Sequence, residues 1–189
     1  MKVIDGGRTR RLCWDDCTIV VAPADTPPFD LDARVFEEDT FRIMSAAPEW
    51  APPAVHPVRL MHELQHYAPD PPGSVVVQAG RPMRLLAIVH DVNRDPTWRA
   101  AWIEAALRQI MQEAARFRLH AMGLPLLGRQ HGRMPRAALG DLLAGVLMDR
   151  QVRYPRRLWL MAAAPADGKV VFAALRDRLG TDGKLQGQR

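Results

Sequence analysis

The sequence of 189 residues contains no long hydrophobic stretch. No apolar run approaches the roughly 20 residues that cross a bilayer. The amino-terminal segment MKVIDGGRTRR also lacks the apolar region of a secretory signal. We therefore expect a cytoplasmic protein with no membrane contact. The length fits one domain, which we place at residues 1–180, followed by a mobile tail at residues 181–189.

Cysteine is scarce, and the two thiols do not form a redox motif. Cys13 and Cys17 lie in the stretch CWDDC, whose spacing is not that of C-x-x-C. We interpret them as reduced structural thiols. The main interpretation of the sequence accordingly includes no metal site and no cofactor.

Acidic residues are fewer than basic ones, which gives a net charge of +5 and a pI near 9.9. Such a charge is compatible with a nucleic-acid or polyphosphate partner. However, nearly all the positive charge is arginine in a chain rich in Ala and Pro, a bias that a GC-rich genome also produces. Because no known nucleic-acid-binding signature accompanies the short clusters RTRR and RYPRR, we do not expect nucleic acid to be a partner.

Hydrophobic periodicity predicts strands that alternate with helices. Apolar, β-branched runs predict strands at residues 17–25, 74–78, 84–92, 119–127 and 157–163. Helical spacing and capping signals predict helices at residues 33–47, 58–67, 94–117, 135–149 and 169–179. This alternation indicates an α/β fold in which a sheet lies between helices.

Two loops follow predicted strands at their carboxyl ends, where open α/β sheets bind ligands. One loop is Ala22–Asp25, and the other is Leu126–Pro135, between a strand and a helix. Gly128 and Gly132 would allow backbone N–H groups to approach a phosphate in the second loop. Positive charge in the same loop comes from Arg129, His131 and Arg133.

Four stretches together resemble the macrodomain, the ADP-ribose-binding α/β module. VAPAD, from Val21 to Asp25, is similar to the family motif V-N-x-A-N. LLAIVHDVN resembles the central strand, and WIEAALRQIMQEAARF resembles the helix that follows it. GLPLLGRQHGRMP, from Gly123 to Pro135, resembles the phosphate loop, with Gln130 where a glycine usually stands.

The resemblance implies a fold and a ligand. It implies a three-layer α/β/α arrangement with a mixed central sheet, and binding of ADP-ribose or a related nucleotide diphosphate. Asp25 would contact a ribose, whereas Gly128, Arg129, Gln130, His131, Gly132 and Arg133 would bind phosphate. It also implies an ADP-ribosylated protein as a candidate partner and hydrolysis of an ADP-ribosyl bond as a candidate activity. Whether the chain is an enzyme stays open, because Ala22 and Asp25 replace the two asparagines of the motif.

A second interpretation rests on the stretch MHELQHY, in which His62, Glu63 and His66 have the H-E-x-x-H spacing of zinc hydrolases. Two imidazoles one helical turn apart could hold zinc, and the carboxylate could act as a base. The prolines that follow directly would end this helix early, and no third ligand has a metalloprotease spacing. We therefore favour two histidines on a surface helix.

A third interpretation is a macrodomain-like scaffold without catalysis, which binds a protein or nucleic acid through its basic surface. Two further groups of residues have more than one interpretation. Glu37, Glu38 and Asp39 resemble a metal-binding cluster, but we predict a solvated helix face. His90 with Asp91 could form an acid–base pair, and we predict instead a histidine that ends a strand.

Overall fold

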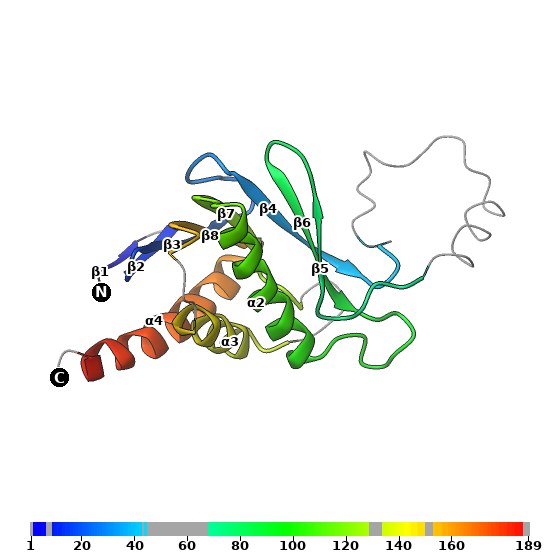
Figure 1. Cartoon of the computed structure of the whole chain (residues 1–189). Coiled ribbons are helices and arrows are strands. Elements are labelled where there is room, and N and C mark those ends of the chain that lie inside the picture. Colours follow the sequence, from blue (N-terminus) through cyan, green and yellow to red (C-terminus); the bar gives the residue numbers. More distant parts are fainter. Residues whose placement is uncertain are drawn as a thin grey trace.

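The computed structural model describes residues 2–6, 9–42, 44, 68–128, 134–149 and 153–186. These residues form an eight-stranded sheet with helices packed against it (Figure 1). The strands are β1 Lys2–Gly6, β2 Thr9–Trp14, β3 Cys17–Pro23, β4 Ala33–Asp39, β5 Val75–Gln78, β6 Met83–His90, β7 Ala121–Pro125 and β8 Arg157–Ala162. The described helices are α2 Ala100–Arg116, α3 Arg136–Met148 and α4 Pro165–Gln186.

The sheet is mixed, with the order β1-β2-β3-β8-β7-β4-β6-β5. The five central strands are parallel to one another, in the order β3, β8, β7, β4 and β6. The outer strands β1, β2 and β5 pair in the antiparallel sense. Five adjacent parallel strands therefore bring their carboxyl ends to one edge of the sheet and their amino ends to the opposite edge. This arrangement decides where the functional residues meet.

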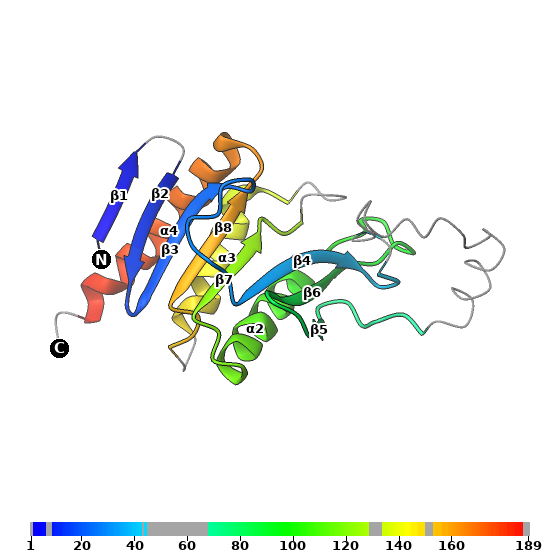
Figure 2. The same ribbon diagram turned by 90° about the horizontal axis from the view of Figure 1, so that it is seen from above.

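The three described helices lie together on one face of the sheet (Figures 1 and 2). Their apolar sides, which include Ile103, Leu143 and Val171, share one buried cluster with residues of β3, β6, β7 and β8. On the opposite face, Phe29 and Leu31 of the β3–β4 loop pack against a smaller cluster that contains Trp159. No helix among the described residues covers that face, and none of the described helices could span a membrane.

The structure confirms the predicted α/β class and the mixed sheet, but one of the predicted helices is wrong. Residues 33–39 form the strand β4, which pairs with β6 on one side and β7 on the other. Ala33 and Val35 are buried, whereas Arg34 and Phe36 are only half-buried, which is the two-residue period of a strand. Pairing with two distant strands outweighs the local charge pattern, which resembles that of a helix.

Other differences concern the boundaries of elements. The sequence patterns did not predict β1 and β2, which form a hairpin ahead of β3. Helix α2 begins at Ala100, because residues 91–97 form a turn in which the Asp91 N–H donates to the Thr97 carbonyl at 2.7 Å. Helix α4 runs from Pro165 to Gln186 and so extends beyond the predicted helix at residues 169–179. The expectation of a mobile tail at residues 181–189 stays a prediction.

Two glycines of α3 provide a matched test of the helix packing. A Cβ at Gly140 would lie 2.7 Å from Ala174 Cβ and 3.0 Å from the Val171 carbonyl oxygen, whereas a Cβ at Gly145 would meet nothing within 4 Å. We expect Gly140→Ala to lower the free energy of unfolding by about 1–2 kcal/mol, since overpacking against α4 exceeds the gain in helix propensity. Denaturant titration measures this change.

Gly145→Ala is the control in the same helix. It should raise the free energy of unfolding by up to about 1 kcal/mol, because alanine is the better helix former and the site has room. Equal effects of the two substitutions would contradict the close α3–α4 contact at Gly140.

Candidate functional site

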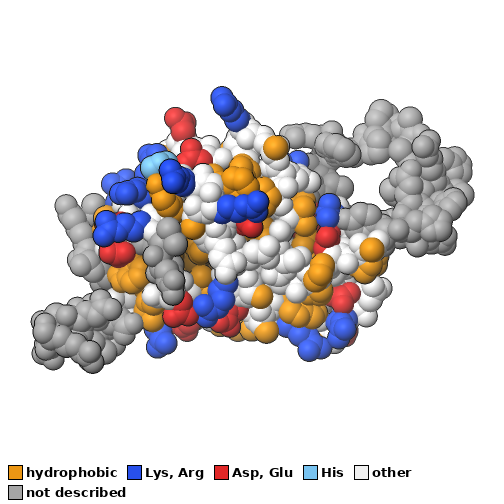
Figure 3. All heavy atoms as spheres, viewed as in Figure 1, with side chains coloured by type: hydrophobic (Ala, Val, Ile, Leu, Met, Phe, Trp, Pro, Cys, Tyr) orange, Lys and Arg blue, Asp and Glu red, His pale blue; other side chains and the backbone are white. Residues whose placement is uncertain are grey.

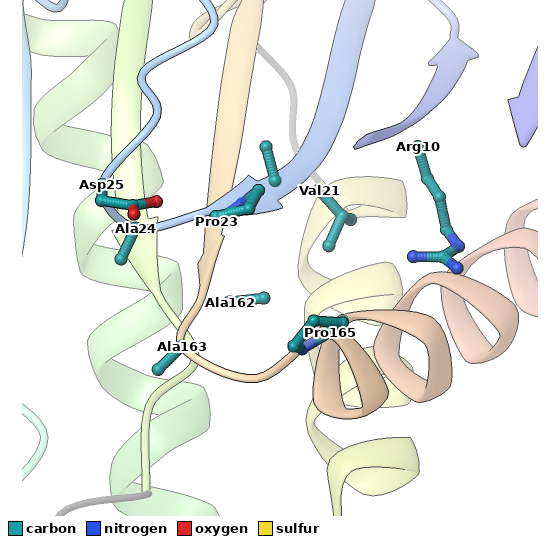
Figure 4. A pocket seen from close by; sticks show the side chains of 10 residues that line it. Arg10, Val21, Pro23, Ala24, Asp25, Ala162, Ala163 and Pro165 are labelled. Carbon is teal, nitrogen blue, oxygen red and sulfur yellow. The ribbon is translucent and has the colours of Figure 1, made fainter. Parts of the chain in front are cut away.

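The carboxyl edge of the parallel strands contains a pocket between the ends of β3 and β8 and the start of α4 (Figure 4). Its volume is about 280 Å³. The pocket is lined by Arg10, Val21, Ala22, Pro23, Ala24, Asp25, Ala162, Ala163, Pro165 and Gly168. Most of the wall is therefore small and apolar, and the charged side chains are few.

Asp25 and Arg10 give this apolar pocket its polarity. Figure 4 shows them on opposite sides of it, Asp25 on the loop after β3 and Arg10 on β2. Asp25 is exposed, and its Oδ1 atom accepts a hydrogen bond from the Thr26 hydroxyl at 3.0 Å. The start of α4 closes a further side of the pocket, so the positive end of that helix dipole faces the cavity. Such a pocket suits a flat, mostly apolar group with polar atoms at its rim.

A second polar group lies at the same edge, at the ends of β4 and β6. His90 Nε2 lies 2.5 Å from Glu37 Oε1, and both side chains are buried. The same Glu37 oxygen accepts a hydrogen bond from the backbone N–H of Gly128, at 3.1 Å. Because a carboxylate can only accept, the Nε2 proton of His90 donates to it. The other ring nitrogen, Nδ1, lies 3.4 Å from Thr97 Oγ1.

This network places Gly128 at the start of the predicted phosphate loop. Gly128 has φ = +74°, and a Cβ there would lie 2.9 Å from Ile103 Cδ1, so the position requires glycine. Glu37 thus ties the end of β4 to the end of β6 and to the chain leaving β7. Since Glu37 and His90 are buried, they fix the position of Gly128 rather than contact a ligand.

Glu38 and Asp39 continue the acidic stretch, and their carboxylates accept hydrogen bonds from backbone N–H groups. Glu38 Oε1 and Asp39 Oδ2 both accept from the Met44 N–H, at 2.7 and 2.8 Å, and Asp39 Oδ1 accepts from the Phe41 N–H at 2.7 Å. The prediction of a solvated helix face was therefore wrong. These carboxylates are buried at the end of a central strand and shape the turn that follows it.

The structure brings together two of the residues that the sequence identified. Asp25 follows β3 and Gly128 follows β7, and only β8 separates these two strands. Arg129, Gln130, His131, Gly132 and Arg133 lie outside the described residues, as do His62, Glu63 and His66. In the part of the chain that the structure describes, no three His, Cys, Asp or Glu side chains are grouped to hold a metal ion.

Sequence reasoning missed the partner of His90 and the pocket wall on β8. His90 is the last residue of β6, as predicted, but its partner is Glu37, 53 residues away, and not the alternative partner Asp91. Cys13 and Cys17 form no disulfide, in agreement with the prediction of reduced thiols, and they lie on the paired strands β2 and β3. Only the order of the strands could have indicated these arrangements.

Comparison with known proteins gives structural matches only. No protein-family model and no curated protein matches the sequence. The Oceanobacillus iheyensis macrodomain with ADP matches with a TM-score of 0.67 at 10% identity, over 92% of this chain and 97% of its own. A variant of that protein with ADPR matches with a TM-score of 0.68 at 12% identity, over 91% and 99%.

A third match comes from another bacterium. The macrodomain of Thermus aquaticus DarG has a TM-score of 0.53 at 15% identity, over 76% of this chain and 97% of its own. The chain has a macrodomain fold. The fold that the sequence motifs implied is thereby confirmed. At these identities the likeness concerns the macrodomain fold alone, and the ligand has to be argued from the pocket.

Proposed function

We propose that this chain binds ADP-ribose, or a closely related nucleotide diphosphate, at the carboxyl edge of its sheet. The observation that carries the proposal is the apolar pocket at the ends of β3 and β8, with Asp25 at its rim and Gly128 two strands away. Two solved structures of one macrodomain of similar fold, the Oceanobacillus iheyensis protein and a variant of it, are complexes with ADP or ADPR. Their ligands support the same class of ligand here.

The pocket would receive the nucleoside end of the ligand. A base is flat and largely apolar, which suits a wall made of Val21, Ala22, Pro23, Ala162 and Pro165. The Asp25 carboxylate accepts hydrogen bonds, so it would recognise a ribose hydroxyl beside the base. Its exposed position leaves this rim accessible to a ligand.

The diphosphate would extend from this pocket toward the loop after β7. Neighbouring strands are about 4.8 Å apart, so β3 and β7 are roughly 10 Å apart, a span that a diphosphate and its ribose can bridge. The backbone N–H groups of residues 129–133 would then bind phosphate, with Arg129, His131 and Arg133 supplying charge. The N–H of Gly128 donates to Glu37, which fixes the backbone directly before these residues.

A calorimetric titration with ADP-ribose tests the proposal, with AMP and ribose 5-phosphate as partial ligands. We expect micromolar affinity for ADP-ribose and weaker binding of AMP, because AMP lacks the second phosphate and ribose. Gly132→Val should weaken ADP-ribose binding at least tenfold and leave adenosine binding unchanged. An absence of heat at millimolar ADP-ribose, from protein shown to be folded, would refute the proposal.

Hydrolysis of an ADP-ribosyl bond belongs to the same proposal as its catalytic extension. Asp25 is the group we would test as the base that activates water, since it is an exposed carboxylate at the pocket. This role requires the opposite orientation of the ligand, with the distal ribose rather than the adenosine ribose at Asp25. Release of ADP-ribose from a modified protein, compared between the native chain and Asp25→Asn, is the measurement. The zinc hydrolase with His62, Glu63 and His66 stays a prediction, and the metal content of protein purified without added zinc would test it.

A further inference from the structure

The edge of the sheet opposite the pocket is rich in arginine. Strands β8, β7, β4 and β6 are adjacent and parallel, so their amino ends share this edge. In Figure 3 several Lys and Arg side chains surround a histidine, with Asp and Glu side chains beside them, and further Lys and Arg side chains are spread over the same face. The edge arginines, as we name them, lie at or just before the first residues of these strands: Arg34, Arg81, Arg84, Arg118, Arg156 and Arg157.

None of the edge arginines forms an ion pair with a carboxylate among the described residues. Seven arginines elsewhere in the described chain do so, whereas Arg11, Arg99 and Arg178 do not; the pairs are Arg42–Asp70, Arg94–Asp91, Arg108–Asp149, Arg116–Glu113, Arg136–Asp167, Arg153–Asp16 and Arg176–Asp177. Asp32 lies at the same edge, but its Oδ2 atom accepts from the backbone N–H groups of His120 and Ala121. Among the described residues, the edge arginines therefore outnumber the one carboxylate named at this edge, and none of them is paired with it.

Arg34 and Arg84 show the strongest sign of a missing anion. They are direct cross-strand partners on β4 and β6, an arrangement in which like charges repel. Both guanidinium groups lie over the Phe36 ring, at 5.5 and 4.7 Å from its centre. The Nε atoms of both are buried without a hydrogen-bond partner. Both side chains are only half-buried, so an external anion that binds the outer guanidinium nitrogens would relieve the repulsion.

Aromatic rings support further edge arginines. Arg157 lies over Phe29 at 5.0 Å, and Arg156 lies over Tyr154 at 6.0 Å. Stacking on a ring fixes the plane of a guanidinium and leaves its N–H edge for a ligand. Arg81, Arg118, Arg156 and Arg157 are exposed, so a large partner can reach them.

The sequence clusters alone did not favour nucleic acid, but from the arrangement of the edge arginines we propose that this edge binds the phosphate backbone of a single-stranded nucleic acid. The guanidinium fork matches the geometry of phosphate oxygens. The arginines extend over four adjacent strands, about 14 Å, which is long enough for successive phosphates of one strand. Arginines interleaved with aromatic rings are also typical of surfaces that bind unpaired nucleotides. The edge is opposite the ADP-ribose pocket, so this interaction does not depend on the proposed function.

Fluorescence anisotropy with labelled single-stranded RNA and DNA 20-mers tests the proposal, in low salt and then across a salt series. We expect the affinity to fall linearly on a log–log plot against salt. The double variant Arg156→Gln/Arg157→Gln should weaken binding at least tenfold and reduce the salt slope by about 1.4, since each phosphate contact on a single strand contributes about 0.7. Arg34→Gln/Arg84→Gln should do the same, with folding checked by circular dichroism.

The matched control is Arg108→Gln/Arg176→Gln, which removes the same charge from ion-paired arginines on helices. It should change the affinity less than twofold. No binding at low salt, or an equal loss in the control, would overturn the proposal. Binding of polyglutamate but not of the oligonucleotides would overturn it in favour of an acidic protein partner. ADP-ribose titration of the edge variants should match the native chain, which separates this test from that of the pocket.

Discussion

Replacing Ala163 by tryptophan is expected to abolish ADP-ribose binding while the protein stays folded. Ala163 follows β8, lines the pocket and is exposed, so the larger side chain can be accommodated without disturbing the core. An indole ring would fill much of a cavity of about 280 Å³ and exclude the base. We expect the dissociation constant to rise at least 30-fold, which corresponds to about 2 kcal/mol of binding free energy. Calorimetry with ADP-ribose measures the change.

Ala166→Trp is the matched control for this substitution. Ala166 is also exposed and lies in the first turn of α4, but it does not line the pocket. Its affinity for ADP-ribose should stay within twofold of the native value. If both tryptophan variants bind like the native chain, the ligand does not occupy this pocket, and the proposed site would have to be abandoned.

Replacing Glu37 by alanine is expected to give a large loss of stability. The substitution removes the acceptor of two N–H groups at once, that of His90 Nε2 and the backbone N–H of Gly128, at buried positions. Each buried donor that loses its acceptor costs about 1–3 kcal/mol. We expect the free energy of unfolding to fall by about 3 kcal/mol and the melting temperature by roughly 6–12 °C for a chain of this size. Denaturant and thermal unfolding measure these two quantities.

Glu37→Gln separates the hydrogen bonds from the charge. The amide oxygen of glutamine can still accept from both donors, so the loss should be about 1 kcal/mol. A double-mutant cycle with His90→Leu should show a coupling energy between the two side chains. If Glu37→Ala and Glu37→Leu unfold with the native free energy, the buried network does not stabilise the protein.

The same network predicts a selective effect on ligands. Glu37 accepts from the N–H of Gly128 at the start of the predicted phosphate loop. Replacing Glu37 should therefore weaken the binding of ADP-ribose more than the binding of adenosine. Equal losses for the two ligands would indicate a general loss of structure instead. Binding and stability measured on the same Glu37 variants therefore distinguish positioning of the loop from support of the fold.

Local sequence patterns predicted a large part of this molecule. The apolar, β-branched runs at β3, β6 and β8 are buried strands, because a strand covered on both faces needs continuous apolar residues. The motif similarity led to the macrodomain fold, which the solved structures share. Asp25 and Gly128 could be found because a loop after a buried strand is the usual ligand position in such sheets. Their roles stay predictions.

Strand β4 shows where local patterns fail. Its charged residues resemble those of an exposed helix face: Arg34, Glu37, Glu38 and Asp39. The neighbouring residues in the sequence do not indicate that three of these side chains, all carboxylates, are buried. The structure buries them because β4 lies in the sheet between β7 and β6. His90, Gly128 and Met44 then supply the hydrogen-bond donors that these carboxylates need. Two of these donors lie more than 50 residues from their acceptor.

The sequence by itself determined the α/β class, the identity of most strands and the loops that can hold a ligand, since these depend on residue periods within one segment. The tertiary structure decided which segments meet. It placed Asp25 beside the end of β8, joined Glu37 to His90, and set the edge arginines on four neighbouring strands. Strand order is a long-range property of the fold: composition gives the number of arginines, but only the sheet brings these arginines to one edge, where none has a carboxylate partner among the described residues.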